Sequence, residues 1–226
     1  MIILAIDTAS TLCAACVYDA EHDAELGRTV LDLGKGHAEH LMSVVEGALA
    51  ESGLAFADLG AIGVSVGPGS FTGVRVGVSS ARGFALALGI PSIGVTTLEA
   101  VAAQTRDEFG ATAVMSAFDA GRDEIHAAVH DAAGMPVHAP AIITLHDALE
   151  WSEALEPVLA GSAANRIAAA APRPMRVGST AATADIAIYA RLAASRAGSA
   201  EKPSPLYLRQ ADAKPQAGFV LARREA

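Results

Sequence analysis

The glycine-rich segment 67–73 has the composition in this sequence that best suits ligand chemistry. It contains Gly67-Pro68-Gly69-Ser70-Phe71-Thr72-Gly73 and precedes a predicted helix. Backbone N–H groups at such a junction can bind a phosphate. The segment lacks the Gly-Lys-Ser/Thr ending of a P-loop, and glycines also permit positive φ and close backbone packing. We favour the structural role and keep a weak or vestigial anion site as the alternative.

The histidine and serine residues do not form a convincing metal site or nucleophile. His126 and His130 have H-x-x-x-H spacing, but they fall in a predicted strand, on which their side chains would be about 13 Å apart. His37 and His40 can meet on a helix, yet no further ligand type follows nearby. No Ser–His–Asp set can be argued from the spacing of these residues. We therefore expect neither a metal site nor nucleophilic catalysis.

Cys13 and Cys16 form a C-x-x-C pair. A redox pair would open a helix after a strand, whereas residues 11–18 are themselves a predicted strand. An odd separation on a strand directs the two side chains to opposite faces. We expect two small core residues, because free cysteine is commonly buried.

Composition excludes several classes of protein. The 226 residues include 16 basic and 25 acidic side chains, for a formal net charge of −9. Autonomous nucleic-acid binding is not expected, because it requires clustered Lys and Arg. The N-terminal residues lack the basic region of a signal peptide, and uncharged stretches such as 83–98 are too short to span a membrane. We expect a soluble, cytoplasmic protein without a membrane partner.

The elements that position these residues follow from two periodicities. Short apolar runs bounded by turn residues predict strands, and apolar residues that recur every three or four positions predict helices. Thr72 is the predicted N-cap of a helix that ends before Gly89. The predicted order is strands 2–6, 11–18 and 25–33, helix 37–52, strand 61–66, helix 72–88, strand 91–95 and helix 97–105.

The second half repeats this order with weaker signals. We place the boundary near Arg106, which divides the chain into units 1–106 and 107–226. The predicted elements are strands 113–118, 125–130 and 136–144, helix 145–153, strand 158–160, helix 162–171, a short extended piece at 176–177, helix 181–197 and an extended segment 203–209. A meander of three strands joined to α-crossovers is typical of an actin-like, ribonuclease H-like (ASKHA) α/β fold with two lobes.

Four segments resemble the TsaB (YeaZ) family in their order along the chain: Ile2–Ser10, Gly67–Gly77, Gly89–Leu98 and Pro205–Arg209. The resemblance implies an actin-like fold with a reduced second lobe. It also implies that the chain is the non-catalytic partner of TsaD, the enzyme that transfers threonylcarbamoyl to a tRNA adenosine. The ATPase TsaE joins the two subunits in that family.

The same segments are similar to TsaD, in which two histidines after the Gly-x-Pro turn bind the catalytic metal. Thr97 and Val101 stand at those positions here. Threonine is a poor ligand and valine is none, so the resemblance implies a relative without the metal site. Asp7 stands where actin-like ATPases hold an acid near the nucleotide's metal, but we favour a turn-capping role for it. A candidate vestigial nucleotide or anion site consists of Asp7, Thr8, Gly67, Gly69 and Ser70.

Small residues recur every four positions on helix 72–88. Such a stripe lets another helix approach closely, and packing against the protein's own sheet is the alternative. The family resemblance favours a contact of four helices, built from helices 37–52 and 72–88 of two related chains. The predicted interface residues are His37, Leu41, Val45, Gly73, Gly77, Ala81 and Ala85.

These observations favour a non-catalytic scaffold for threonylcarbamoyladenosine (t6A) synthesis. Its expected partners are TsaD and TsaE, with a homodimer in isolation and no strong direct tRNA binding. We expect no tightly bound cofactor, and ATP or ADP only at the interface of the complex. The alternatives are a stand-alone actin-like ATPase or phosphotransferase, and a peptidase.

Overall fold

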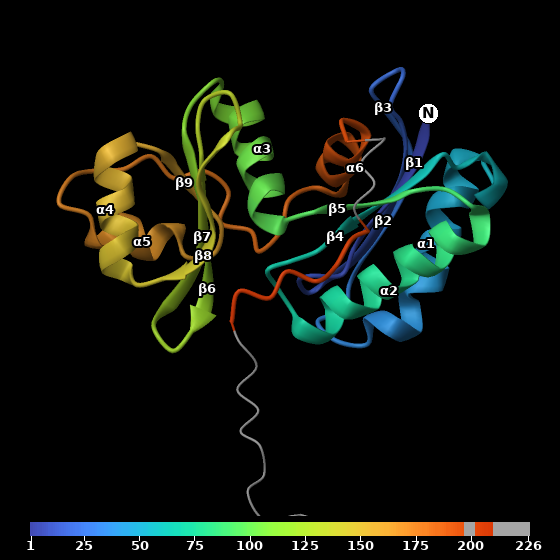
Figure 1. The fold of residues 1–226 in the computed structure, drawn as a ribbon, viewed down its shortest axis with the longest axis horizontal. Coiled ribbons are helices and arrows are strands. Elements are labelled where there is room, and N and C mark those ends of the chain that lie inside the picture. Colours follow the sequence, from blue (N-terminus) through green and yellow to red (C-terminus); the bar gives the residue numbers. More distant parts are fainter. Residues whose placement is uncertain (197–201, 210–226) are drawn as a thin grey trace, which may run out of the picture.

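Five layers of secondary structure follow one another across the molecule (Figure 1). The computed structural model describes residues 1–196 and 202–209. From right to left, Figure 1 shows helices α1 and α2, a first sheet, helices α6 and α3, a second sheet, and helices α4 and α5. Both sheets are therefore covered by helices on both faces, as expected for an α/β fold.

The first sheet has the strand order β3-β2-β1-β4-β5. Strands β1, β2 and β3 form an antiparallel meander, and β4 and β5 run parallel to β1. Their side chains are buried on both faces of β1, β2 and β4, which explains the almost continuous apolar runs of the sequence. The elements are β1 (Ile2–Asp7), β2 (Leu12–Asp19), β3 (Ala24–Asp32), α1 (His37–Ser52), the 3₁₀ turn Phe56–Asp58, β4 (Ala61–Ser65), α2 (Phe71–Leu88) and β5 (Ser92–Val95).

The second sheet repeats the meander but is smaller. Its order is β8-β7-β6-β9, with β9 parallel to β6. Val177 makes one parallel bridge to Leu159 at the place where a fifth strand would lie. The elements are β6 (Val114–Gly121), β7 (Glu124–His130), β8 (Pro136–Ile143), α4 (Leu145–Leu155), β9 (Val158–Ala160) and α5 (Ala164–Ala170).

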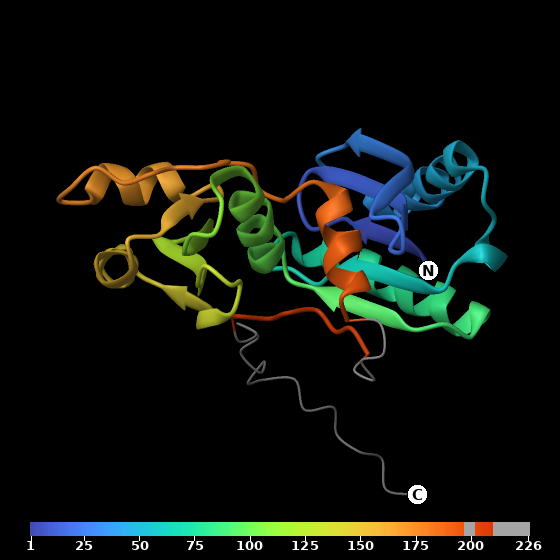
Figure 2. The same cartoon turned by 90° about the horizontal axis from the view of Figure 1, so that it is seen from above.

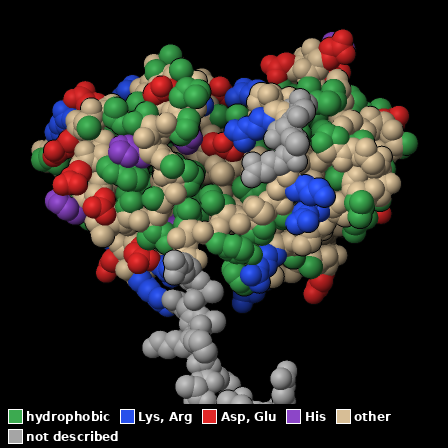
Figure 3. Space-filling view, viewed as in Figure 1, with side chains coloured by type: hydrophobic (Ala, Val, Ile, Leu, Met, Phe, Trp, Pro, Cys, Tyr) green, Lys and Arg blue, Asp and Glu red, His purple; other side chains and the backbone are tan. Residues whose placement is uncertain are grey.

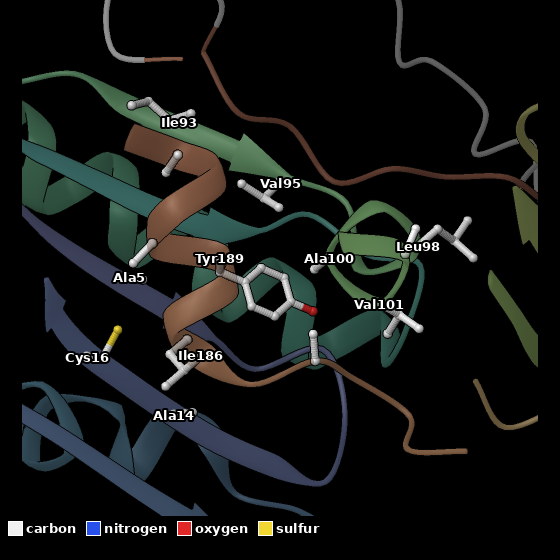
Figure 4. Packing of buried hydrophobic residues seen from close by; sticks show 14 of the residues in the cluster. Ala5, Ala14, Cys16, Ile93, Val95, Leu98, Ala100, Val101, Ile186 and Tyr189 are labelled. Carbon is white, nitrogen blue, oxygen red and sulfur yellow. The ribbon is translucent and has the colours of Figure 1, made fainter. Parts of the chain in front are cut away.

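Helices α3 (Thr97–Phe109) and α6 (Ile186–Ala194) lie between the sheets, and each packs on the sheet of the other half. Helix α3 follows the first sheet in the chain but contacts β6, β7 and β9. Helix α6 comes from the second half but contacts β1, β2 and β4. Figure 2 shows the two helices between the sheets. Their contact belongs to one apolar cluster that includes Ile3 of the first sheet and Phe118 of the second. Figure 4 shows Leu98 of α3 and Tyr189 of α6 within this cluster.

This exchange bears on the predicted boundary between the halves, and the structure corrects the start of one predicted helix. The boundary at Arg106 falls inside α3, and α6 packs outside the unit 107–226 to which we assigned it. The division into 1–106 and 107–226 therefore stays a prediction about folding units. The predicted helix 181–197 begins only at Ile186, because the Asp185 side chain accepts a hydrogen bond from the Ala187 N–H and caps it.

Residues 203–209 run from the first sheet to the second, and we call this segment the strap (Figure 2). The N–H of Leu206 donates to the Val66 carbonyl at 2.8 Å. At the far end, Arg209 forms an ion pair with Glu124 of β7. The strap thus connects the two halves through contacts outside the central helices.

Candidate functional site

The turn after β1 and the loop before α2 form the candidate vestigial site, and they are locked together. The Ser70 N–H donates to the Ala9 carbonyl at 2.7 Å, and the Thr8 hydroxyl donates to the Gly73 carbonyl at 2.7 Å. A Cβ atom on Gly73 would lie 2.0 Å from the Thr8 carbonyl oxygen, and one on Gly69 would lie 2.2 Å from that of Ala9. The glycines therefore permit close backbone approach, which is the structural role that we favoured.

The cap of α2 differs from the predicted one. The Ser70 hydroxyl, and not that of Thr72, accepts a hydrogen bond from the Gly73 N–H at 3.2 Å. Helix α2 therefore begins at Phe71. Gly67, with φ of +91°, turns the chain between β4 and this cap. The cap thus occupies one of the N–H groups that a phosphate would need.

Asp7 is 1% exposed, and its carboxylate accepts hydrogen bonds from three neutral donors. The Ala9 N–H donates at 2.9 Å, which is the turn cap predicted from the sequence. The Ser65 hydroxyl also donates to Oδ1, and the Thr183 hydroxyl donates to Oδ2 at 2.6 Å. Both carboxylate oxygens thus serve internal contacts.

The Asp7 network continues into α6. The Thr183 and Tyr189 hydroxyl oxygens are 2.7 Å apart. Burial, together with the nearby Asp7 charge, raises the pKa of Tyr189 well above its usual value. Figure 4 shows the Tyr189 ring between α6 and α3. The network ties the end of β1 to the segment that returns from the second half.

Thr97 and Val101 lie one turn apart near the start of α3. The resemblance to TsaD implies metal-binding histidines at these two positions. Both are buried within the central apolar layer. The preceding residue Thr96 and Glu99 form a capping box, and Glu99 pairs with Arg196 of the segment after α6 at 2.6 Å. In the described ranges 1–196 and 202–209, no three His, Cys, Asp or Glu side chains are grouped so as to hold a metal ion.

The remaining candidate side chains are also accounted for by packing. His126 and His130 lie on β7, a strand as predicted. Cys13 and Cys16 are buried on opposite faces of the first sheet, in two different apolar clusters, and are free thiols. Burial raises the pKa of Cys13 to about 11, which makes it a poor nucleophile.

The predicted partner interface requires correction. All seven residues are buried within the chain itself. A Cβ on Gly77 would lie 2.5 Å from the Thr8 hydroxyl oxygen, and Ala81 and Ala85 belong to the apolar cluster under α1 and α2. The stripe therefore packs against the protein's own first sheet, so these side chains are not available to a partner helix.

The outer face of α1 and α2 is the surface that remains available. We define it by Met42, Val76 and Leu86, with Glu39, Glu46 and Arg82 as its charged members. Leu86 is 86% exposed and Met42 is 47% exposed. A shallow groove of about 440 Å³ between the helices is lined by Ala38 of α1 and by Phe71, Thr72, Arg75, Val76, Ser79 and Ser80 of α2. Sequence periodicity places these residues on the side of each helix opposite its apolar stripe, so the same helical pattern contained the signal for them.

A second hollow lies beneath the strap. It has a volume of about 360 Å³ and is lined by the loop before α2, the first turn of α2, His126 of β7 and residues 205–209. Burial and the nearby Arg209 lower the pKa of His126, which favours its neutral form. No local sequence pattern indicates this hollow, because three segments that are far apart in the chain form it.

A family model described as TsaD, tRNA N6-adenosine threonylcarbamoyltransferase, matches residues 32–214. An uncharacterized protein of Mycobacterium tuberculosis, Rv3421c, is 36% identical over 223 residues, which are 95% of each chain. The tRNA threonylcarbamoyladenosine biosynthesis protein TsaB of Escherichia coli is 37% identical over 126 residues. The chain belongs to the TsaB (YeaZ) family. The match to the Escherichia coli TsaB covers 56% of this chain and 53% of that protein.

Solved structures of the YeaZ family extend the likeness to almost the whole chain. YeaZ from Pseudomonas aeruginosa has a TM-score of 0.76 at 26% identity, with 92% of this chain and 99% of that chain covered. The chain therefore has the α/β fold of the YeaZ structures, and its second sheet is the smaller one, as expected for a reduced second lobe. No helix in the described part of this TsaB-type chain has both the length and the apolar character needed to cross a membrane.

Proposed function

We propose that this chain acts in tRNA threonylcarbamoyladenosine biosynthesis as a non-catalytic subunit that pairs with a TsaD-type transferase. The observation that carries the proposal is the burial of Thr97 and Val101 between the two sheets, at the positions where the resemblance to TsaD implies metal-binding histidines. The burial of Asp7 and its hydrogen bonds to three donors of the chain support it, because they give this acid a structural role.

The outer face of α1 and α2 is the proposed contact with TsaD, and with a second copy of the chain in isolation. Its exposed apolar side chains would be buried by a related pair of helices. The exposed side of α1 carries Glu39 and Glu46, whereas α2 carries Arg82. A two-fold arrangement that places α1 of one subunit against α2 of the other would pair these opposite charges.

In this proposal the partner proteins bind the tRNA, and TsaE binds to the assembled pair of this chain and TsaD. The net charge of −9 disfavours phosphate binding by this chain. On the face shown in Figure 3, Lys and Arg side chains lie in separate groups among acidic and apolar ones. Binding of ATP or ADP would occur only where a partner completes the site.

Reconstitution tests the proposal. TsaD, TsaE, tRNA, ATP and threonylcarbamoyl-adenylate are incubated with and without this chain, and mass spectrometry of digested tRNA measures the product. We expect sustained turnover only with the complete set. Equal product without this chain would refute the scaffold role, and product from this chain alone would make it an enzyme.

A matched pair of variants tests the contact surface. Leu86→Arg places a charge on the outer face, whereas Met135→Arg places one on an exposed apolar site of the second half, where Met135 is 63% exposed. We expect Leu86→Arg to weaken binding to TsaD at least tenfold and Met135→Arg to leave it within about twofold. The opposite ranking would move the interface to the second half.

A further inference from the structure

The hollow beneath the strap is shaped for one bulky apolar group. Its volume of about 360 Å³ is at the small end of the range of roughly 300–1,000 Å³ for ligand pockets. Pro68, Val74, Leu206 and Leu208 supply apolar walls, and the half-buried, neutral His126 supplies one polar edge. A large cofactor would not fit, but one aromatic or branched side chain would.

The rim of the hollow carries a pre-organised arginine. The Arg75 guanidinium carbon lies 3.6 Å from the centre of the Phe71 ring, and its Nε donates to the Tyr207 hydroxyl at 2.7 Å. Phe71 and Tyr207 are 60% and 53% exposed, and their ring centres are 5.9 Å apart. These two contacts hold Arg75 in place, so binding through it would lose little side-chain entropy.

Arg75 has no carboxylate partner among residues 1–196 and 202–209, although acidic residues outnumber basic ones in the chain. Its Nε is used by Tyr207, and the two terminal amino groups remain to donate to an anion. An exposed Phe, Tyr and Arg beside an apolar pocket have the composition of an interface hot spot. The rim therefore suits an anionic group, and the hollow beside it suits an apolar group adjacent to that anion.

We infer that this site binds a segment of a partner protein in which a bulky apolar side chain is adjacent to an Asp or Glu. The apolar side chain fills the hollow, and the carboxylate accepts hydrogen bonds from the terminal amino groups of Arg75. One guanidinium suffices for one carboxylate, whereas a nucleic-acid strand requires several cations. Phe71 and Arg75 also line the groove between α1 and α2, so the site adjoins the outer face defined by Met42, Val76 and Leu86. The inference does not depend on the proposed function, because it concerns a peptide segment and is tested without a transferase.

Selection from a random heptapeptide library displayed on phage, with the full-length chain immobilised, tests the inference without any transferase. We expect enrichment of peptides with an aromatic or branched apolar residue next to Asp or Glu. Fluorescence anisotropy of the enriched peptide then measures its affinity. Arg75→Gln should weaken binding about tenfold or more, because a charge-assisted hydrogen bond is lost.

Arg82→Gln is the matched control, since Arg82 is on the same helix but does not line the hollow. It should leave the affinity within about twofold. Leu208→Trp, which fills the hollow, should abolish binding while circular dichroism shows an unchanged fold. No consensus, a basic consensus, or a consensus insensitive to Arg75→Gln would overturn the inference. Tighter binding of a labelled oligoribonucleotide through Arg75 would also overturn it and would assign the site to nucleic acid.

Discussion

The two halves of the chain follow one plan with unequal completeness. Each has a three-strand meander, a helix, a parallel strand and a second helix, yet α2 has 18 residues and α5 only 7. Pro172 and Pro174 follow α5 closely, and a proline disfavours helix in the residue before it. The first half adds a fifth strand, whereas the second has a single bridge at Val177. The second half is therefore reduced in its outer elements, whereas its meander is intact.

The central layer explains why the second meander is retained. The second meander packs against α3, which follows the first sheet in the chain. Helix α6, from the second half, packs against the first sheet. Each sheet thus has one face covered by a helix from the other half of the chain: α6 covers the first sheet and α3 covers the second. The reduced half is therefore a structural requirement of the fuller one.

The largest expected effect comes from separating the halves. Residues 1–111 and 112–209, produced alone, should each lack a cooperative thermal transition, because the central apolar cluster needs both. Circular dichroism of each fragment and of their mixture, against the intact chain, measures this. A cooperative transition in fragment 1–111 would show that α6 is dispensable for the first sheet.

Glycine substitutions test the close approach that the first half makes at its loop. Gly73→Ala would force a Cβ to 2.0 Å from the Thr8 carbonyl oxygen and should cost about 3 kcal/mol of unfolding free energy. Gly83→Ala, where nothing lies within 4 Å, should stabilise α2 by about 0.5–1 kcal/mol. Urea denaturation compares the two variants. Similar effects would mean that the turn and the loop separate easily.

The Asp7 network tests the tie between the halves. Thr183→Val removes the hydroxyl that lies between Asp7 and Tyr189 and should cost about 1–3 kcal/mol, because buried polar groups lose a partner. Thr72→Val, an exposed site on α2, is the control and should change stability by less than about 0.5 kcal/mol. A neutral Thr183→Val would show that the Asp7 contacts do not couple the halves.

A smaller effect concerns pH and should come from the second half. Burial is the main cause that lowers the pKa of both His126 and His130 in the folded state. Histidine in the unfolded chain has a pKa near 6.5, so below that pH the unfolded chain binds more protons than the folded chain. The free energy of unfolding is therefore at its full value above about pH 6.5 and falls on acidification. Each histidine can contribute at most about 1.4 kcal/mol per pH unit.

Urea denaturation between pH 7.5 and 5.5 measures this slope. His130→Gln should reduce it, whereas His146→Gln, an exposed site on α4, should not. A slope that both variants leave unchanged would assign the pH dependence to other groups.

The sequence predicted elements well where the pattern is local. Helix 37–52 has the predicted bounds, because His37 and five apolar residues share one buried face and Gly53 adopts the left-handed conformation that ends the helix. The opposite orientation of Cys13 and Cys16 follows from strand periodicity alone. Elements with a strong periodicity and a glycine stop were thus accessible to sequence reasoning.

Contacts between distant segments were not accessible. Small residues on α2 indicate a close contact, but not which surface makes it, and the contact is with Thr8 of the same chain. The Arg75–Tyr207 pair joins residues 132 positions apart, and no local pattern links them. The start of α6 was misplaced because alanines before Asp185 suit a helix, while the cap at Asp185 excludes them.

The placement of α6 has a consequence for how the chain is made. One face of the first sheet, with Ile3, Ala5, Cys16 and Val95, is complete when the ribosome has passed β5, but its cover ends at Ala194. At roughly 5–20 residues per second, this apolar face stays uncovered for several seconds of translation. The nascent first half therefore exposes this apolar face until α6 has left the exit tunnel.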